Sequence, residues 1–308
     1  MRIIINGQQA FGKACLEAIL AAGIDQVVAV YTAPDRAGEP VDPLKDVALA
    51  RGLLVVQPPD YADATVLDQL EALGADLMIM AYTSVFVPEA ARNLPRYGSI
   101  CFHPSLLPLH RGPSSINWPL IWGEEKTGLS IFWPDDGLDQ GDILLQSEVE
   151  IGPDDTLGTV YFSKIFPTGV KAVLEAVELI RAGNPPHQTQ DGSRSTYEGW
   201  CRQKDAAVDW WCSAAEVYNL IRGTDPQPGA WTTYEGKTLQ LYDCARVEAY
   251  GRPGEVVALS DERITVVAGG GGISVGRVRF DGGKKVAAAE FGAAHGIAVG
   301  SRLGVGRA

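Results

Sequence analysis

The fold is decided by residues 2–31, which read RIIINGQQAFGKACLEAILAAGIDQVVAVY. A short apolar run at 2–6 ends in a glycine, apolar side chains at helical spacing follow it, and a second apolar run fills 27–31. Short β-branched runs on either side of an amphipathic helix are typical of a β-α-β unit with parallel strands. The chain therefore begins as one part of an α/β sheet.

The same alternation continues further along the chain. Apolar runs typical of buried strands recur at 53–57, 76–80, 98–102 and 129–133. Helical patterns fill 43–51, 64–73 and 158–182. This order predicts a parallel-rich, Rossmann-like sheet with crossover helices. The first turn, GQQAFG, lacks the GxGxxG spacing of a dinucleotide site.

The composition changes after the long predicted helix. Residues 183–206 are rich in Pro, Gly, Gln and Ser, which indicates a linker. A helix predicted at 213–223 is followed by short β-like runs at 230–234, 238–246, 254–259, 263–267 and 273–280. Such runs favour a small OB-like β-barrel. We therefore predict two domains, 1–206 with the linker included and 207–308.

The overall composition excludes collagen-like, low-complexity and wholly disordered proteins. The 308 residues are 46% hydrophobic and 21% charged, which is ordinary for a globular protein. Residues 1–206 carry 15 basic and 27 acidic side chains, so the net charge of −12 lies entirely there. This balance disfavours nucleic-acid binding. No apolar run is long enough to span a membrane, and no signal peptide is readable.

Five cysteines without a CxxC pair indicate reduced thiols. We therefore expect a cytoplasmic protein with neither a disulfide framework nor a zinc site. An EF-hand-like calcium loop is excluded because the acidic stretch at 135–142 lacks flanking helices and the distal Glu. No metal is expected.

Two stretches carry candidate chemistry. CFHPSLLPLHRG, residues 101–112, places His103 directly after a predicted strand, in a loop that prolines stiffen. DDGLDQGD, residues 135–142, places four carboxylates after another strand. Both loops could converge at one edge of the sheet, where open α/β sheets bind ligands. A His beside a carboxylate is a general acid–base pair. A buried structural histidine and a solvated turn are the simpler alternatives.

The motif HPSLLPLHRG followed by LDQGD closely resembles the signature of formyltransferases that use 10-formyltetrahydrofolate. Further matching blocks are found at 115–118, 130–142, 196–199, 208–210 and 221–231. The family includes methionyl-tRNA formyltransferase, glycinamide ribonucleotide transformylase and sugar-amine formyltransferases. The amino-terminal hydrolase domain of 10-formyltetrahydrofolate dehydrogenase resembles this sequence most. The resemblance implies a Rossmann-like formyltransferase domain followed by a small β-barrel domain.

The family's catalytic pattern is Asn-x-His with a distant Asp. Carried over to this sequence, the His is His103 and the Asp is Asp139, 36 residues later. The Asn position falls on Cys101, so this sequence departs from the family pattern. The hydrolase domain of the dehydrogenase also lacks Asn at this position. Cys101 is then either a small buried residue or a participating thiol. The oxyanion would be stabilised by protonated His103, a backbone N–H, or a water held by Asp139.

The resemblance implies 10-formyltetrahydrofolate as co-substrate and tetrahydrofolate as product. The residues expected to line the folate slot are Phe86, Val87, Ser105, Leu106, Asp135, Asp136 and Gly137. Arg111 is expected to bind an anionic part of the substrate, and Asn117 an acceptor. The alternatives are an exposed structural Arg at 111, a helix cap at 117, and core packing at 86 and 87.

The resemblance implies that the formyl group is removed from 10-formyltetrahydrofolate and passed to water or a small acceptor, an amine or a carrier thiol. No carrier domain is readable, so we expect a separate carrier protein. Methionyl-tRNA is disfavoured as acceptor because residues 32–45 and 207–308 are not basic. A sugar amine is disfavoured by the missing Asn. A non-catalytic folate-binding module is the alternative of another class.

Overall fold

The computed structural model describes residues 1–304, which form two compact units. The first comprises Met1–Gly112, Gly128–Val149 and Lys164–Tyr197, and the remaining segments form the second. The predicted cut at residue 206 differs from this division because residues 113–127, 150–163 and 198–206 also join the second unit. Residues 305–308 of the predicted second domain lie outside the described residues.

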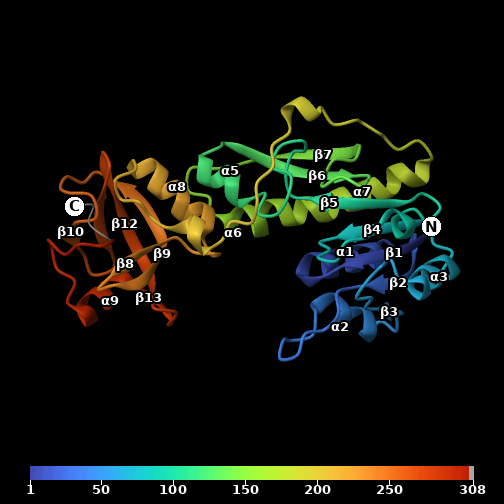
Figure 1. Cartoon of the computed structure of the whole chain (residues 1–308), viewed down its shortest axis with the longest axis horizontal. Coiled ribbons are helices and arrows are strands. Elements are labelled where there is room, and N and C mark those ends of the chain that lie inside the picture. Colours follow the sequence, from blue (N-terminus) through green and yellow to red (C-terminus); the bar gives the residue numbers. More distant parts are fainter. Residues whose placement is uncertain (305–308) are drawn as a thin grey trace. The chain divides into compact units, whose positions relative to one another are not determined.

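The first unit contains a seven-stranded sheet in the order β3-β2-β1-β4-β5-β6-β7. Its strands are β1 (Arg2–Gly7), β2 (Gln26–Tyr31), β3 (Val55–Val56), β4 (Leu77–Ala81), β5 (Ser99–His103), β6 (Lys126–Phe132) and β7 (Ile143–Glu150). Strands β1 to β5 pair in parallel, whereas β5 and β6 are antiparallel. The predicted parallel-rich, Rossmann-like sheet is confirmed (Figure 1). Strand β7 was not anticipated from the apolar pattern.

Helices lie along this sheet in Figure 1. They are α1 (Gln9–Ala22), α2 (Pro43–Ala50), α3 (Ala64–Ala72), α4 (Glu89–Arg92) and α7 (Phe166–Ala182). Helix α1 buries Phe11, Cys15, Leu16 and Ile19, the face that the helical spacing predicted. Gly7 is required where β1 passes β4, because a Cβ there would lie 2.2 Å from the carbonyl oxygen of Ala81.

The helix predicted at 158–182 is interrupted. Helix α6 (Leu157–Thr159) runs into a π-helix at Val160–Ile165 before α7 begins, although the apolar periodicity is continuous. The Pro at the start of α7 has no N–H to donate, which favours a change in hydrogen bonding at that point.

The second unit is built around antiparallel strands in the order β10-β11-β12-β9-β8, with β13 paired to β12. The strands are β8 (Trp231–Tyr234), β9 (Lys237–Val247), β10 (Val256–Leu259), β11 (Ile264–Ala268), β12 (Gly271–Phe280) and β13 (Lys285–Ala287). The helices are α5 (Asn117–Trp122), α8 (Ala214–Thr224) and α9 (Ala288–His295), together with α6 and short 3-10 turns at Gly192–Arg194 in the first unit and Gln203–Ala206 in the second. The predicted α/β class with a small antiparallel β domain after it is confirmed.

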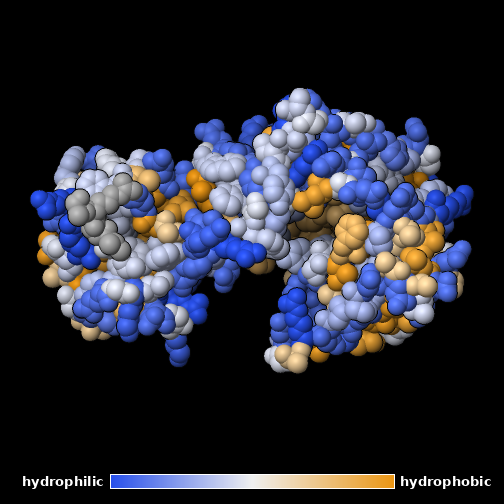
Figure 2. All heavy atoms as spheres, viewed as in Figure 1, coloured by the Kyte–Doolittle hydropathy of each residue, from blue (hydrophilic) through white to orange (hydrophobic). Residues whose placement is uncertain are grey.

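Within residues 1–304 no helix is long and apolar enough to cross a membrane. The surface of the first unit mixes hydrophilic and hydrophobic side chains (Figure 2). Its large exposed apolar side chains include Tyr82, Phe86 and Leu138. Two of these, Phe86 and Leu138, lie in the loops that the sequence singled out for ligand binding.

Candidate active site

His103 ends β5, the strand between β4 and β6 in the first sheet. Its side chain is buried, and its Nε2 atom lies 2.8 Å from the carbonyl oxygen of His110. A carbonyl oxygen only accepts hydrogen bonds, so Nε2 carries the proton in this contact. The other ring nitrogen, Nδ1, is therefore the one that the His110 carbonyl does not engage.

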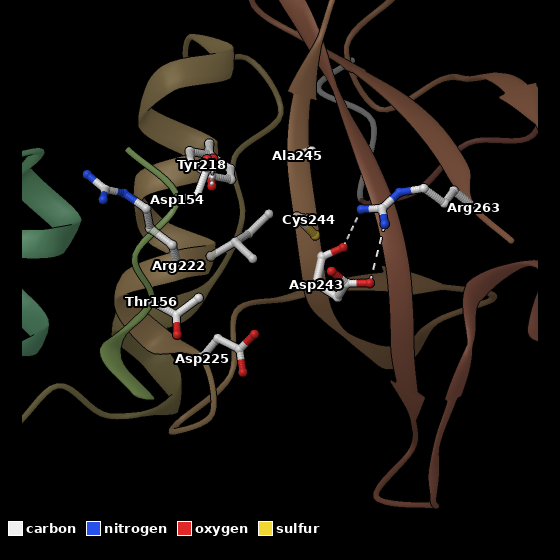
Figure 3. Close-up of a pocket in the computed structure, with 10 residues that line it drawn as sticks. Asp154, Thr156, Tyr218, Arg222, Asp225, Asp243, Cys244, Ala245 and Arg263 are labelled. Carbon is white, nitrogen blue, oxygen red and sulfur yellow. Dashed lines mark hydrogen bonds and ion pairs between the residues drawn. The ribbon is translucent and has the colours of Figure 1, made fainter. Parts of the chain in front are cut away.

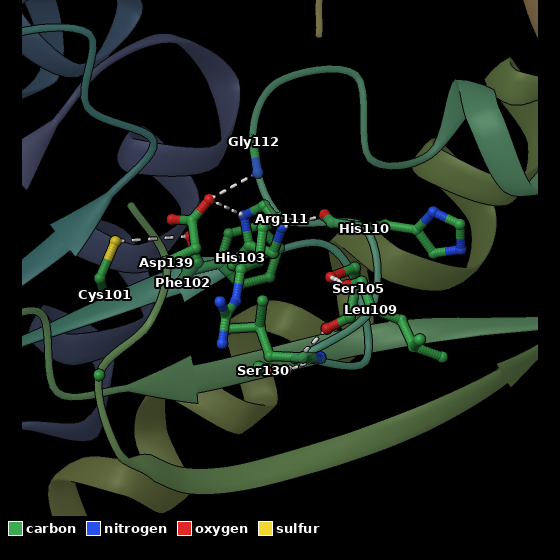
Figure 4. Close-up of polar contacts among 12 residues, drawn as sticks. Cys101, Phe102, His103, Ser105, Leu109, His110, Arg111, Gly112, Ser130 and Asp139 are labelled. Carbon is green, nitrogen blue, oxygen red and sulfur yellow. Dashed lines mark hydrogen bonds and ion pairs between the residues drawn. The ribbon is translucent and has the colours of Figure 1, made fainter. Parts of the chain in front are cut away.

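Asp139 faces this nitrogen from the loop that follows β6. Its Oδ2 atom lies 3.7 Å from His103 Nδ1 and accepts a hydrogen bond of 2.8 Å from the backbone N–H of Gly112 (Figure 4). A separation of 3.7 Å is too long for an N–H···O hydrogen bond but within ion-pair range. The structure thus brings together the His and the carboxylate that the sequence singled out, in the arrangement of an acid–base group with an orienting carboxylate.

Cys101 lies two residues before His103 on β5 and packs against apolar clusters on the sheet. Burial raises the pKa of its thiol well above the ordinary value, and the charge of Asp139 adds to the effect. A protonated thiol is a poor nucleophile. The structure therefore argues against the interpretation of Cys101 as a reactive thiolate and favours that of a small packed residue.

The loop after His103 is braced by internal hydrogen bonds. Ser105 is fully buried, and its hydroxyl donates to the carbonyl oxygen of Leu109 at 2.7 Å. The Ser130 hydroxyl donates to the carbonyl oxygen of Ser105 at 2.7 Å and accepts from the N–H of Leu107 at 3.1 Å. Leu106 packs over Gly128, because a Cβ added at Gly128 would lie 2.5 Å from the Leu106 side chain. These contacts hold the loop, and the folate contacts of Ser105 and Leu106 stay predictions.

Phe86 and Val87 follow β4 and differ in exposure. Phe86 is 72% exposed, whereas Val87 is buried in the cluster that also contains Ala91. An exposed aromatic ring beside a sheet edge can cover a flat ligand, whereas Val87 fixes the segment to the core. Val87 thus packs in the core, one of the two alternatives that the sequence left open, and the folate contact of Phe86 stays a prediction.

The acidic loop is anchored at its start. Asp135 accepts a hydrogen bond from the N–H of Gly137 at 2.9 Å, which forms an Asx turn. Asp136 pairs at 2.6 Å with Arg92 of α4, whose side chain is only 5% exposed. The Nε and Nη1 atoms of Arg92 have no hydrogen-bond partner among the described residues. Arg92, which links α4 to the acidic loop, was not predicted as a site residue.

Arg111 and Asn117 occupy different units. In the first unit, Arg111 donates from Nε and Nη2 to the side-chain oxygen of Gln190, at 3.2 and 2.8 Å. In the second, Asn117 is buried and donates to the carbonyl oxygens of Gly223 and Gln227, at 2.8 and 3.2 Å. The Asn117 amide thus joins α5 to α8 and satisfies the Gly223 carbonyl in the last turn of α8, in line with the helix-cap alternative, while its contact with an acceptor stays a prediction.

The second unit contains a cavity of about 260 Å³ (Figure 3). Its charged lining residues are Asp154, Arg222, Asp225, Asp243 and Arg263. Asp243 and Arg263 pair at 3.3 Å, Tyr218 donates to Asp154, and Arg222 donates to the Gly152 carbonyl. Asp225 lies 3.9 Å from Lys285. The described lining includes no histidine. The described lining of the cavity therefore offers no imidazole as an acid–base group, and we place the candidate site at His103.

No group of His, Cys, Asp and Glu among residues 1–304 has the arrangement of a metal site. A Rossmann-like sheet with a His–Asp pair at the end of a central strand, followed by an antiparallel unit, defines the chain as an α/β protein with a candidate acid–base site.

Comparison with known proteins gives the particular family. Residues 1–177 match the formyl transferase family and residues 201–296 match the formyl transferase C-terminal domain. The chain therefore belongs to the formyl transferase family.

Curated relatives differ in how much of their length the chain covers. It is 36% identical over 307 residues to the cytosolic 10-formyltetrahydrofolate dehydrogenase of Xenopus laevis, covering 94% of this chain but 34% of that protein. It is 35% identical over 309 residues to the methionyl-tRNA formyltransferase of Syntrophus aciditrophicus, covering 98% of both. The chain thus spans about a third of the length of the dehydrogenase relatives.

Solved structures share the fold. HypX from Aquifex aeolicus, determined in complex with tetrahydrofolic acid, matches with a TM-score of 0.66 at 21% identity. The match covers 95% of this chain and 47% of that one. At this identity the likeness confirms the fold, while the reaction has to be argued from the site.

Proposed function

We propose that this protein removes the formyl group from 10-formyltetrahydrofolate and transfers it to water or a small acceptor, releasing tetrahydrofolate. The observation that carries the proposal is the buried His103 with Nδ1 3.7 Å from the Asp139 carboxylate. The identity to proteins named 10-formyltetrahydrofolate dehydrogenase supports the choice of folate.

The site suggests a role for each member of the pair. As the acceptor adds to the formyl carbon, its proton passes to Nδ1 of His103, and the protonated imidazole then stabilises the resulting oxyanion. The bond from that carbon to N10 of the folate then breaks, and His103 delivers a proton to the departing nitrogen. With water as acceptor the products are formate and tetrahydrofolate. Since Nε2 is held by the His110 carbonyl, the exchanged proton moves at Nδ1, which Asp139 orients.

Product analysis tests the proposal. The protein is incubated with 10-formyltetrahydrofolate alone, then with an amine or a pantetheine thiol, and formate, formylated acceptor and tetrahydrofolate are measured. We expect tetrahydrofolate in every case where a competent acceptor is present. Formate without added acceptor indicates hydrolysis. Folate binding without turnover under all conditions would contradict the proposal and leave a binding module.

Methionyl-tRNA is the second candidate acceptor, because the match to a methionyl-tRNA formyltransferase covers nearly the full length of both chains. The charge distribution opposes it: residues 1–206 are strongly acidic and residues 207–308 carry 11 charges of each sign. A gel-shift titration with initiator tRNA separates the two candidates. Tight, salt-sensitive binding would favour tRNA, and its absence favours a small or carrier-bound acceptor.

The five cysteines without a CxxC pair favour action in a reducing compartment such as the cytoplasm. A separate carrier protein would supply the acceptor thiol.

A further inference from the structure

The segment predicted as a linker is attached to the active-site loops in the first unit. We call residues 188–197 the strap. At its start, Gln188 and Ile143 exchange backbone hydrogen bonds of 2.8 and 3.0 Å. At its end, the N–H of Thr196 donates to the carbonyl of Pro108, and the Thr196 carbonyl accepts from the N–H of Arg111. Both ends of the strap are therefore anchored to the site.

Gln190 lies between these anchors. Its side-chain amide joins the acidic loop at 135–142 to the loop that follows His103. Its Nε2 atom donates to the carbonyl oxygens of Asp139 and Gly141, at 2.9 and 2.8 Å. Its Oε1 atom accepts from Nε and Nη2 of Arg111, at 3.2 and 2.8 Å. Both amide protons and the amide oxygen are thus used, and each contact spans at least 49 residues of sequence.

The contact with Asp139 bears directly on catalysis because of the backbone conformation there. Asp139 has a φ of 53°, in the left-handed region that non-glycine residues adopt only at some cost in free energy. A hydrogen bond to its carbonyl fixes this conformation, which aims the carboxylate at the N–H of Gly112 and at His103 Nδ1. The loop has little room to rearrange, since a Cβ at Gly141 would lie 1.7 Å from the carbonyl oxygen of Trp133.

We propose that Gln190 is a positioning residue, which holds Asp139 in register with His103 by tying the acidic loop to the His103–Gly112 loop. The effect on turnover rests on the proposed function, whereas the coupling of the two loops does not. Gln190 acts through Asp139 and touches neither the formyl group nor the acceptor.

Three variants separate the contacts of Gln190. Gln190→Ala removes all of them. Gln190→Glu keeps an acceptor for Arg111 but sets a carboxylate against the carbonyls of Asp139 and Gly141. Gln188→Ala is the matched control, because Gln188 has the same side chain, lies two residues earlier in the strap and is exposed. Circular dichroism and thermal melting establish that each variant is folded.

With 10-formyltetrahydrofolate we expect Gln190→Ala and Gln190→Glu to lower kcat on the order of tenfold to a hundredfold, with a much smaller change in KM. Gln188→Ala should match the wild type. In an Asp139→Asn background the further loss from Gln190→Ala should nearly vanish, because the residue has nothing left to position. Equal losses in both backgrounds, or wild-type kcat in folded Gln190→Ala, would overturn the proposal.

Hydrogen exchange gives a readout that does not depend on the reaction. In Gln190→Ala, amide protection should fall in both residues 103–112 and residues 135–142, and it should be unchanged in Gln188→Ala. Unchanged protection in Gln190→Ala would overturn the proposed coupling of the loops. If the wild type fails to turn over folate while exchange responds as expected, the proposed function fails and the coupling stands.

Discussion

The His103 site and the cavity of the second unit both gather charged side chains, but they use them differently. In the cavity, Asp243 pairs with Arg263 at 3.3 Å, and Asp225 lies 3.9 Å from Lys285. At the first site a buried imidazole faces a carboxylate at 3.7 Å with Nδ1 left to exchange a proton. Charge density alone therefore does not mark a catalytic site. A buried imidazole held beside an orienting carboxylate is the more specific sign of an acid–base site.

The largest effect expected from this comparison is the loss of activity in His103→Ala. Removing the acid–base group should lower the rate of tetrahydrofolate formation by about 10²- to 10⁴-fold. His187→Ala is the control, because His187 lies in the same unit with 55% of its side chain exposed. It should keep the wild-type rate. An undiminished rate in folded His103→Ala would remove the imidazole from the mechanism.

A smaller effect is expected at Cys101. Because burial raises the pKa of this thiol, it stays protonated at neutral pH and serves as a packed side chain. Cys101→Ala should therefore lower kcat by no more than about threefold, and the wild-type thiol should resist alkylation. Initial rates and mass spectrometry after alkylation test this. A hundredfold loss of kcat in a folded variant would restore Cys101 to the chemistry.

The smallest effect is expected in the second-unit cavity. Burial raises the pKa of Asp225, so the folded state disfavours its ionised form, and that cost is present above the ordinary Asp pKa of about 3.9. Asp225→Asn should therefore raise Tm slightly at pH 7, and the gain should disappear below about pH 4. Turnover should be unchanged. Thermal melts across this pH range measure it, and a lower Tm at pH 7 would show that the Lys285 pair outweighs burial.

Local sequence pattern predicted much of the fold. Strands such as β1 and β4 are continuous apolar runs between helices, and helix α1 shows its buried face in its spacing. Strand β7 was not predicted because exposed polar residues alternate with less exposed ones in its second half, so the strand lacks a long apolar run. The π-helix before α7 was not predicted because hydrophobic periodicity does not distinguish a π-helical turn from an α-helical one.

The site was only partly predictable for a similar reason. His103 and Asp139 lie in unusual motifs after strands, and the resemblance to the formyltransferase pattern singled out this pair. Sheet topology alone did not imply their convergence, because β5 and β6 are antiparallel and their carboxyl ends lie at opposite edges. Gln190 is a polar residue in a Pro-, Gly- and Ser-rich stretch, and its contacts lie 49 or more residues away. Arg92 gave no signal because a single Arg at the end of a short helix is ordinarily exposed. Such roles depend on tertiary contacts that local patterns do not encode.

The central claim is that the Asp139–His103 pair removes the formyl group from 10-formyltetrahydrofolate. Its most direct test is the rate of tetrahydrofolate formation by wild type and Asp139→Asn, with folate affinity measured on both by calorimetry. We predict turnover by the wild type and a loss on the order of a hundredfold or more in the variant, with folate affinity largely retained. Equal rates in the two proteins would contradict the claim.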